Sequence, residues 1–301
     1  MRWMFMFVLL GLCFNLSAQN HQFPKSNMAV VVENNNQHTI GSIISNTLDK
    51  ITLLVNGKDE REFYKSSLKF YKVLDQNDLV LKGKYMFPTT GQTNYLYSSS
   101  AYTLDTDRLA YQLSGIYSEF QIPVSSTIDV GLGTFAGAPL SISVKKRVQI
   151  GSSLNIGIKG YAVWASYFEP SVSGFAGQLL VTNGSKERNI TIGPGVGVGV
   201  ADREIIGVLF STFGLKARIS QKYSLVAEGM FGREFESNYF LGIFSGMVGA
   251  HYHTKRNIIW SGGIGTGGFQ QINFNFWGKS SLDTTFFPMI YGGFRKTWVK
   301  K

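Results

Sequence analysis

The chain has 301 residues, of which 44% are hydrophobic, 14% aromatic and only 16% charged, and it contains 34 glycines. Soluble domains average about 25% charged residues, so the composition argues against an ordinary soluble surface. The formal charge of +10 does not indicate nucleic-acid binding, because the basic residues are scattered and form no continuous stripe with stacking aromatics.

Residues 1–18 predict a secretory signal peptide. Arg2 supplies the positive charge, residues 3–14 form a short apolar core, and Ser17-Ala18 precedes a plausible cleavage point. Cys13 is the only cysteine, and the bulky Leu12 before it favours a signal peptide over a lipoprotein. The mature chain then has no disulfide and no cysteine metal site. Beyond the leader, no apolar run approaches the ~18 residues of a membrane-spanning helix.

Residues 19–84 predict a small β-rich module. Short β-like segments occur at 38–44, 50–55 and 68–73, and Asn56-Gly57 is a tight-turn signal. We expect a soluble SH3-like or Sm-like unit, with a partly ordered segment as the alternative. Residues 85–107 are interpreted as a linker that becomes extended where it meets the following region.

From residue 108 onward, short segments alternate between apolar residues and glycine or polar residues. Between 190 and 200, isoleucine, valine and proline occupy the even positions, and glycine and threonine occupy the odd ones. Successive side chains of a strand point to opposite faces, and in a membrane barrel the apolar face meets lipid while the other faces the lumen. A soluble β-sandwich also alternates and stays the alternative. Segments 205–217, 240–253 and 286–299 alternate less cleanly.

The predicted strands are 108–122, 127–135, 139–147, 150–165, 172–183, 188–200, 204–218, 222–235, 239–253, 257–270, 272–278 and 285–299. Because bacterial barrels have an even number of strands, we predict twelve, with ten as the alternative. The predicted fold is therefore all-β, a closed antiparallel transmembrane β-barrel over 108–301 preceded by the small module. Aromatic residues near the segment ends fit interfacial girdles; they are Tyr111, Phe120, Phe135, Trp164, Tyr167, Tyr239, Phe276, Trp277 and Trp298.

A signal peptide followed by a β-barrel indicates the outer membrane of a Gram-negative bacterium. The expected partners are outer-membrane lipids and lipopolysaccharide near the basic turns, and the barrel assembly machinery, which residues 293–298 (Gly-Phe-Arg-Lys-Thr-Trp) would address as an aromatic-ended last strand. A periplasmic partner is possible for residues 21–84, and no nucleic acid is expected.

Four charged residues fall on the predicted lumen faces: Glu119, Asp129, Lys159 and Glu228. Charges inside a narrow barrel usually pair to fill it, and a path for ions is the weaker reading. These four are the only candidate site residues.

Other motifs yield no catalytic, cofactor or metal site. The string 263–268 matches a dinucleotide fingerprint, but it lies inside an alternating strand, so its glycines are assigned to the lumen. His251 and His253 form a possible metal pair without a third ligand and are interpreted as polar residues of the outer rim. A lipid hydrolase would need one of them beside Ser245 or Ser261, which the spacing does not demand.

We therefore expect a non-enzymatic outer-membrane barrel, either a narrow porin-like channel or a structural and interaction scaffold. The alternatives are a lipid-active enzyme in the same membrane and a soluble periplasmic β-protein that binds a hydrophobic ligand. Short predicted turns leave little chain for receptor loops or for a plug.

The chain resembles a group of uncharacterised Bacteroidetes-type outer-membrane β-barrel proteins. The resemblance rests on residues 83–90 and 93–104 before the barrel, the leader ending Ser17-Ala18-Gln19, the strand at 64–69 and the glycine-rich strands closing at 293–295. The chain departs from that group because it lacks their polar, basic run before the barrel. The resemblance implies the fold and the location, and it supplies no functional residues.

Overall fold

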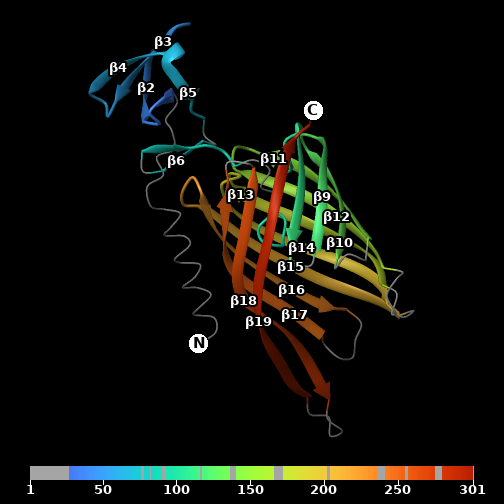
Figure 1. The fold of residues 1–301 in the computed structure, drawn as a ribbon. Coiled ribbons are helices and arrows are strands. Elements are labelled where there is room, and N and C mark those ends of the chain that lie inside the picture. The colour runs from blue at the N-terminus through green and yellow to red at the C-terminus, as the bar shows by residue number, and fades with distance from the viewer. Residues whose placement is uncertain are drawn as a thin grey trace. The chain divides into compact units, whose positions relative to one another are not determined.

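The computed structural model describes residues 27–300 except 76–77, 82, 90–92, 116, 136–139, 166–171, 202–203, 236–240, 255–256 and 275–279. The expected signal peptide lies outside the described residues, as do Tyr167, Tyr239, Phe276 and Trp277 of the expected girdles. The chain divides into two compact units, one ending at Pro88 and one beginning at Thr89 (Figure 1). No helix in the described part is long and apolar enough to cross a membrane.

The first unit contains an antiparallel sheet of five strands in the order β4-β3-β2-β1-β5. The strands are β1 (Met28–Glu33), β2 (His38–Asn46), β3 (Lys50–Val55), β4 (Asp59–Tyr64) and β5 (Leu68–Val73), with a 3₁₀ turn, η1 (Lys65–Ser67), between the last two. A separate hairpin pairs β6 (Leu79–Leu81) with β7 (Lys84–Met86). The finer SH3-like or Sm-like assignment stays a prediction.

Strand β1 is covered by side chains on both of its faces. Ala29 and Val31 pack on one side with residues of β3, and Val30 and Val32 pack on the other side against Tyr85. A strand buried on both faces has a continuous apolar sequence, as residues 28–32 do. The Asn56-Gly57 turn between β3 and β4 has positive φ at both residues, which is the backbone that this pair favours.

The second unit is a closed barrel of twelve antiparallel strands, as the sequence predicts. Strand β8 pairs with β9 and with the last strand, β19, and this second pairing closes the ring. The strands are β8 (Arg108–Ser114), β9 (Tyr117–Ser125), β10 (Ile128–Phe135), β11 (Leu140–Ile150), β12 (Leu154–Ala165), β13 (Val172–Gly184), β14 (Arg188–Ala201), β15 (Glu204–Arg218), β16 (Tyr223–Glu234), β17 (Leu241–His253), β18 (Ile258–Phe274) and β19 (Ser280–Val299).

Two differences in the predicted strands cancel in the count. The segment predicted as one strand over 108–122 is two, because the chain reverses at Gly115, which has a φ of 59°. The segment predicted as 257–270 and the described part of the segment predicted as 272–278 are instead one strand, because Gln271 stays paired on both sides, with Leu241 and Asp283. No turn residue interrupts the chain there.

The barrel wall is apolar on its outer face and polar on its inner face. On β11, Leu140, Ile142 and Val144 are exposed, whereas the alternating Ser143 and Lys145 are buried. A water-soluble barrel would show the opposite arrangement, because burial of apolar surface drives its folding. The outer face therefore needs an apolar surrounding.

Outward aromatic residues form two groups on the strands β16–β19. Near one end, Tyr223, Tyr252, Trp260 and Phe294 stand directly opposite one another on successive strands. Neighbouring rings are in contact, with centroids 5.2 Å apart for the two tyrosines and 5.5 Å apart for Trp260 and Phe294.

A second aromatic group lies eight positions further along on three of these strands. It contains Phe231 on β16, Phe244 on β17 and Phe286 on β19. Eight residues extend about 27 Å along a strand, or about 20 Å along the axis of a barrel whose strands tilt by about 40°. No outward residue between the two groups on β16–β19 is charged, whereas Arg233 and Lys296 lie just outside them.

Candidate functional site

The interior of the barrel holds a segment of the same chain, residues 93–104, here called the inner segment. All of its residues are buried except Tyr97, which is partly buried. The sequence predicts a linker here, whereas the structure places these residues inside the barrel. In a barrel of eight strands, the side chains of the wall just fill the interior. A barrel of twelve strands is wider, and the polar inner segment occupies the space that the wall side chains leave.

The inner segment turns back on itself. The Tyr95 N–H donates to the Ser98 carbonyl and the Ser100 N–H donates to the Thr93 carbonyl, both at 2.9 Å. Asn94 and Ser99 form an antiparallel bridge between the two arms. Residues 93–100 therefore form a small hairpin whose tip is residues 95–98.

The hairpin tip binds the carboxylate of Glu228. The backbone N–H groups of Tyr97 and Ser98 donate to this carboxylate at 2.9 and 3.1 Å, and the Ser98 hydroxyl donates at 2.8 Å. Glu228 is buried in the middle of β16. Consecutive N–H groups of a turn form a concave anion site, so the tip is held by charge-assisted bonds.

The remaining predicted charges bind the later part of the inner segment or pair beside it. Asp129 accepts a bond of 3.0 Å from the Leu104 N–H, and Lys145 lies 3.8 Å from Asp129. Lys159 donates to the Ser99 hydroxyl at 3.0 Å and lies 3.9 Å from Glu119.

The structure therefore places all four predicted residues on the inner face, where Glu119, Asp129 and Lys159 belong to ion pairs and Asp129, Lys159 and Glu228 contact the inner segment. Sequence reasoning missed Lys145 and Arg295. Lys145 has the same parity as Ser141 and Ser143 on β11, which was a usable signal. Arg295 donates to Gln112 and Gln121 at 2.8 and 2.7 Å, on a strand whose alternation is unclear.

Three interior glycines provide space for the inner segment. A methyl group on Gly214 would overlap the ring of Tyr95. One on Gly157 would lie 3.1 Å from Ala101 Cα, and one on Gly263 would lie 3.0 Å from a methyl of Leu96. Part of the lumen glycine pattern thus matches the shape of the hairpin.

An apolar cluster also holds the tip. Tyr95 and Leu96 pack with the buried wall residues Val226 and Met247. The Tyr95 hydroxyl lies 2.5 Å from Asn189 Oδ1 and 2.6 Å from Thr191 Oγ1. Apolar wall residues facing a lumen would be in contact with water if the inner segment were absent.

The residues that flank the inner segment, Thr89 and Asp105, both bind the turn between β13 and β14 at one mouth of the barrel. On one side, the Thr89 N–H and hydroxyl donate to Glu187 at 2.6 and 2.7 Å. On the other side, Asp105 pairs with Lys186 at 2.6 Å, and the Tyr102 hydroxyl donates to the Gly184 carbonyl.

Glu187 is the buried acid of this mouth and pairs with Arg218 at 3.2 Å. Burial alone would raise the pKa of its carboxyl. The nearby charges of Lys216 and Arg218, together with the bonds from Thr89, outweigh burial and lower that pKa below its ordinary value. The contact is therefore maintained by an ionised carboxylate at neutral pH.

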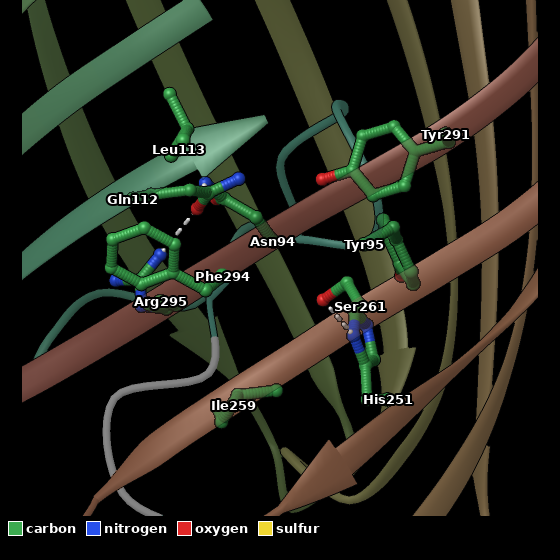
Figure 2. A pocket seen from close by; sticks show the side chains of 10 residues that line it. All are labelled: Asn94, Tyr95, Gln112, Leu113, His251, Ile259, Ser261, Tyr291, Phe294 and Arg295. Carbon is green, nitrogen blue, oxygen red and sulfur yellow. Dashed lines mark hydrogen bonds between the residues drawn. The ribbon is translucent and has the colours of Figure 1, made fainter. Parts of the chain in front are cut away.

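His251 and His253 are not on the outer rim, which corrects the sequence interpretation. Both are buried on the inner face of β17 because they share the parity of the inward residues. His251 Nδ1 lies 2.7 Å from Ser261 Oγ (Figure 2), and His253 Nε2 lies 2.8 Å from Ser224 Oγ. Ser245, the other expected partner, bonds to the Tyr97 hydroxyl instead.

The cavity beside His251 and Ser261 is small. It has a volume of about 10 Å³ and is lined by Asn94, Gln112, Tyr291 and Arg295 among others (Figure 2), which is room for about one water molecule. Within the described part of the chain, the second nitrogen of each histidine has no hydrogen-bond partner. Among those residues, no group of three or more His, Cys, Asp or Glu is placed to hold a metal ion.

The fold and its interior thus define a closed β-barrel with an apolar outer face and a lumen occupied by its own chain. Three solved structures of OmpT, an outer membrane protein of Vibrio cholerae, are similar to it at 10% identity over 90% of this chain. The in-vitro folded trimer form aligns over 96% of its own chain with a TM-score of 0.41, and a second in-vitro folded form over 94% with 0.41. The mutant lacking loop L8 aligns over 96% with a TM-score of 0.39. No protein-family profile and no curated protein matches the chain.

Proposed function

We propose that the protein is an outer-membrane barrel that is closed at rest and serves as a membrane scaffold for its N-terminal unit. The observation that carries this proposal is the inner segment, which lies in the lumen and is bound there by Glu228, Asp129 and Lys159. A solute cannot pass where a polypeptide hairpin already occupies the path. This favours the scaffold over the open porin-like channel.

The membrane location is supported by the outer face. Aromatic residues delimit an uncharged stretch of about 20 Å on β16–β19, close to the apolar band of outer-membrane barrels, which is about 25 Å tall and flanked by aromatic girdles. A closed ladder of strands satisfies the backbone groups that lipid cannot bond. The finer likeness to Bacteroidetes-type proteins stays a prediction based on the sequence alone.

The proposal gives the barrel no catalytic role. Its support is that both Ser–His pairs face the occupied interior and that the cavity beside one of them admits no lipid chain. Incubation of the protein with phospholipid and with lipid A, followed by mass spectrometry, tests this point. A hydrolysed or modified product that disappears in a Ser261→Ala variant would establish the enzyme alternative.

The N-terminal unit offers a groove for a periplasmic partner. The groove has a volume of about 520 Å³ and lies between the β1–β2 turn and the ends of β4 and β5, lined by Glu33, Glu62, Phe63 and Tyr64 among others. Cavities of this size accommodate small ligands or a peptide side chain. The groove supports an interaction role for this unit, and the scaffold would hold it at the membrane.

The deciding experiment is a conductance measurement on the full mature chain in planar lipid bilayers. The scaffold predicts no discrete current steps from the folded, SDS-resistant protein. Regular steps from the wild-type protein would restore the porin-like channel. Recovery of the protein with the soluble periplasm, without detergent, would instead favour the soluble ligand-binding alternative.

A further inference from the structure

We infer that the inner segment is a detachable plug, so that the barrel becomes a passage for small polar solutes when the hairpin withdraws. This inference rests on the proposed function, because it requires a membrane barrel that is closed at rest. It adds a second, conducting state and names the element whose movement produces that state.

The path of the chain allows the hairpin to leave the closed barrel. Thr89 and Asp105, which flank the inner segment, both bind the turn between β13 and β14. The hairpin therefore enters and leaves through one mouth, and it can withdraw through that mouth without threading a chain end through the barrel. Withdrawal breaks no pairing between wall strands, because no barrel strand pairs with the inner segment.

The contacts between the inner segment and the wall are mainly ones that water can replace. Most bonds between the inner segment and the wall join polar groups, such as Ser98 with Glu228 and Ser99 with Lys159, and water can replace each of them. Such exchange leaves each bond a net contribution far below its strength in the absence of water. The apolar cluster at the tip is small and contains only Tyr95 and Leu96 of the inner segment among its fully buried residues, unlike the continuous apolar core of a permanently folded domain.

The wall of the barrel stays intact when the hairpin leaves. Backbone pairing is continuous around all twelve strands, so the ring does not need the hairpin to close. The ion pairs Asp129–Lys145 and Glu119–Lys159 join neighbouring parts of the wall and stay behind when the hairpin leaves. The emptied lumen would present mostly charged, polar and glycine positions, with Val226 and Met247 as a small apolar area, which suits water, ions and small polar solutes.

The test measures currents through the full mature chain in planar bilayers. It compares variants that should displace the hairpin, called opening variants, with a disulfide variant that should hold the inner segment in place, called the lock. Gly214→Ala opens the plug, because its methyl group occupies the place of the Tyr95 ring. Glu228→Gln is a second opening variant that weakens the tip by a different route. Gly197→Ala is the control, because Gly197 is also interior but its nearest atoms all belong to the β13 wall residues 175 and 176.

The lock is the double change Ala101→Cys with Gly157→Cys. The two Cβ positions lie 3.2 Å apart, close to the 3.5–4.5 Å of a disulfide. The only natural cysteine, Cys13, lies in the predicted leader, so the mature chain gives a clean background. Oxidation ties the inner segment to β12 at the residue that follows the hairpin, and a reductant releases it.

The expected result is that the wild type and Gly197→Ala give no current steps, whereas Gly214→Ala and Glu228→Gln give discrete steps. Adding the oxidised lock to Gly214→Ala abolishes the steps, and dithiothreitol restores them. Steps that persist with the oxidised lock would overturn the role of the hairpin. SDS-resistant opening variants that expose the hairpin to proteolysis and yet stay silent would overturn the passage. Steps from the wild type would instead overturn the proposed closure itself, so the two failures are distinguishable.

Discussion

The contact between Gly214 and Tyr95 allows a quantitative prediction. Alanine at position 214 forces the Tyr95 ring from its site, which costs its bonds to Asn189 and Thr191, about 1 kcal/mol each. Loss of the buried ring adds about 1.5–3 kcal/mol. The hairpin should therefore bind the wall about 3–5 kcal/mol more weakly. The wall itself should gain slightly, since alanine is favoured over glycine in a strand by about 0.5–1 kcal/mol.

Hydrogen exchange measured by mass spectrometry in detergent micelles tests this prediction. A tenfold change in an equilibrium corresponds to 1.4 kcal/mol, so the amides of Tyr97 and Ser98 should exchange about 10² to 4 × 10³ times faster in Gly214→Ala. The amides of β15 should keep their protection, and Gly197→Ala should behave as the wild type. If the exchange of Tyr97 and Ser98 is unchanged while that of β15 increases, then the wall yields instead of the hairpin, and the reasoning is refuted.

Three further predictions concern the outer face, an interior ion pair and the mouth. Ile264→Lys, at an outward position with 66% exposure, should lower the free energy of unfolding in lipid vesicles by about 2–4 kcal/mol; a urea titration showing no change would mean that this face meets water. Lys145→Met should leave Asp129 buried without its ion-pair partner, cost about 3–5 kcal/mol, and lower the temperature at which the SDS-resistant gel band unfolds, a shift that Asp129→Asn should partly reverse. Because the pKa of Glu187 is lowered in the folded protein, its stabilisation of the mouth is present above the ordinary carboxyl pKa of about 4.3 and is lost as the pH falls through the lowered value; proteolysis near Thr89 should increase in that range for the wild type, and Glu187→Gln should show the increase already at neutral pH.

The wall of the barrel could be predicted from the sequence because its alternation is a local property. Ser141, Ser143 and Lys145 share one parity, and their neighbours are apolar, so the faces follow from the period of a strand alone. Gly115 shows the limit of this reasoning. Gly115 reverses the chain, whereas the glycines of β18 lie within a continuous strand. The sequence does not distinguish a turn glycine from a strand glycine, and only the pairing with neighbouring strands does.

The inner segment could not be predicted in the same way. Residues 93–104 have no periodicity, and their place depends on partners such as Glu228, which is 130 residues from Ser98. Their composition of serine, threonine and tyrosine fits an extended linker as well as a polar filling for a lumen. The signal that was available is indirect: twelve strands with many inward glycines leave a wide interior, and the wall contains too few large inward side chains to fill it.

The contact between Leu96 and β19 has a consequence for the order of assembly. The Tyr291 hydroxyl donates to the Leu96 carbonyl at 2.5 Å, although 195 residues separate them, and β19 is the last strand to be synthesised. The hairpin therefore cannot make all of its contacts with the wall until β19 has been synthesised, so its final position is reached late in assembly. Contacts between such distant residues form slowly, so the unclosed chain has to persist until its C-terminal strand arrives.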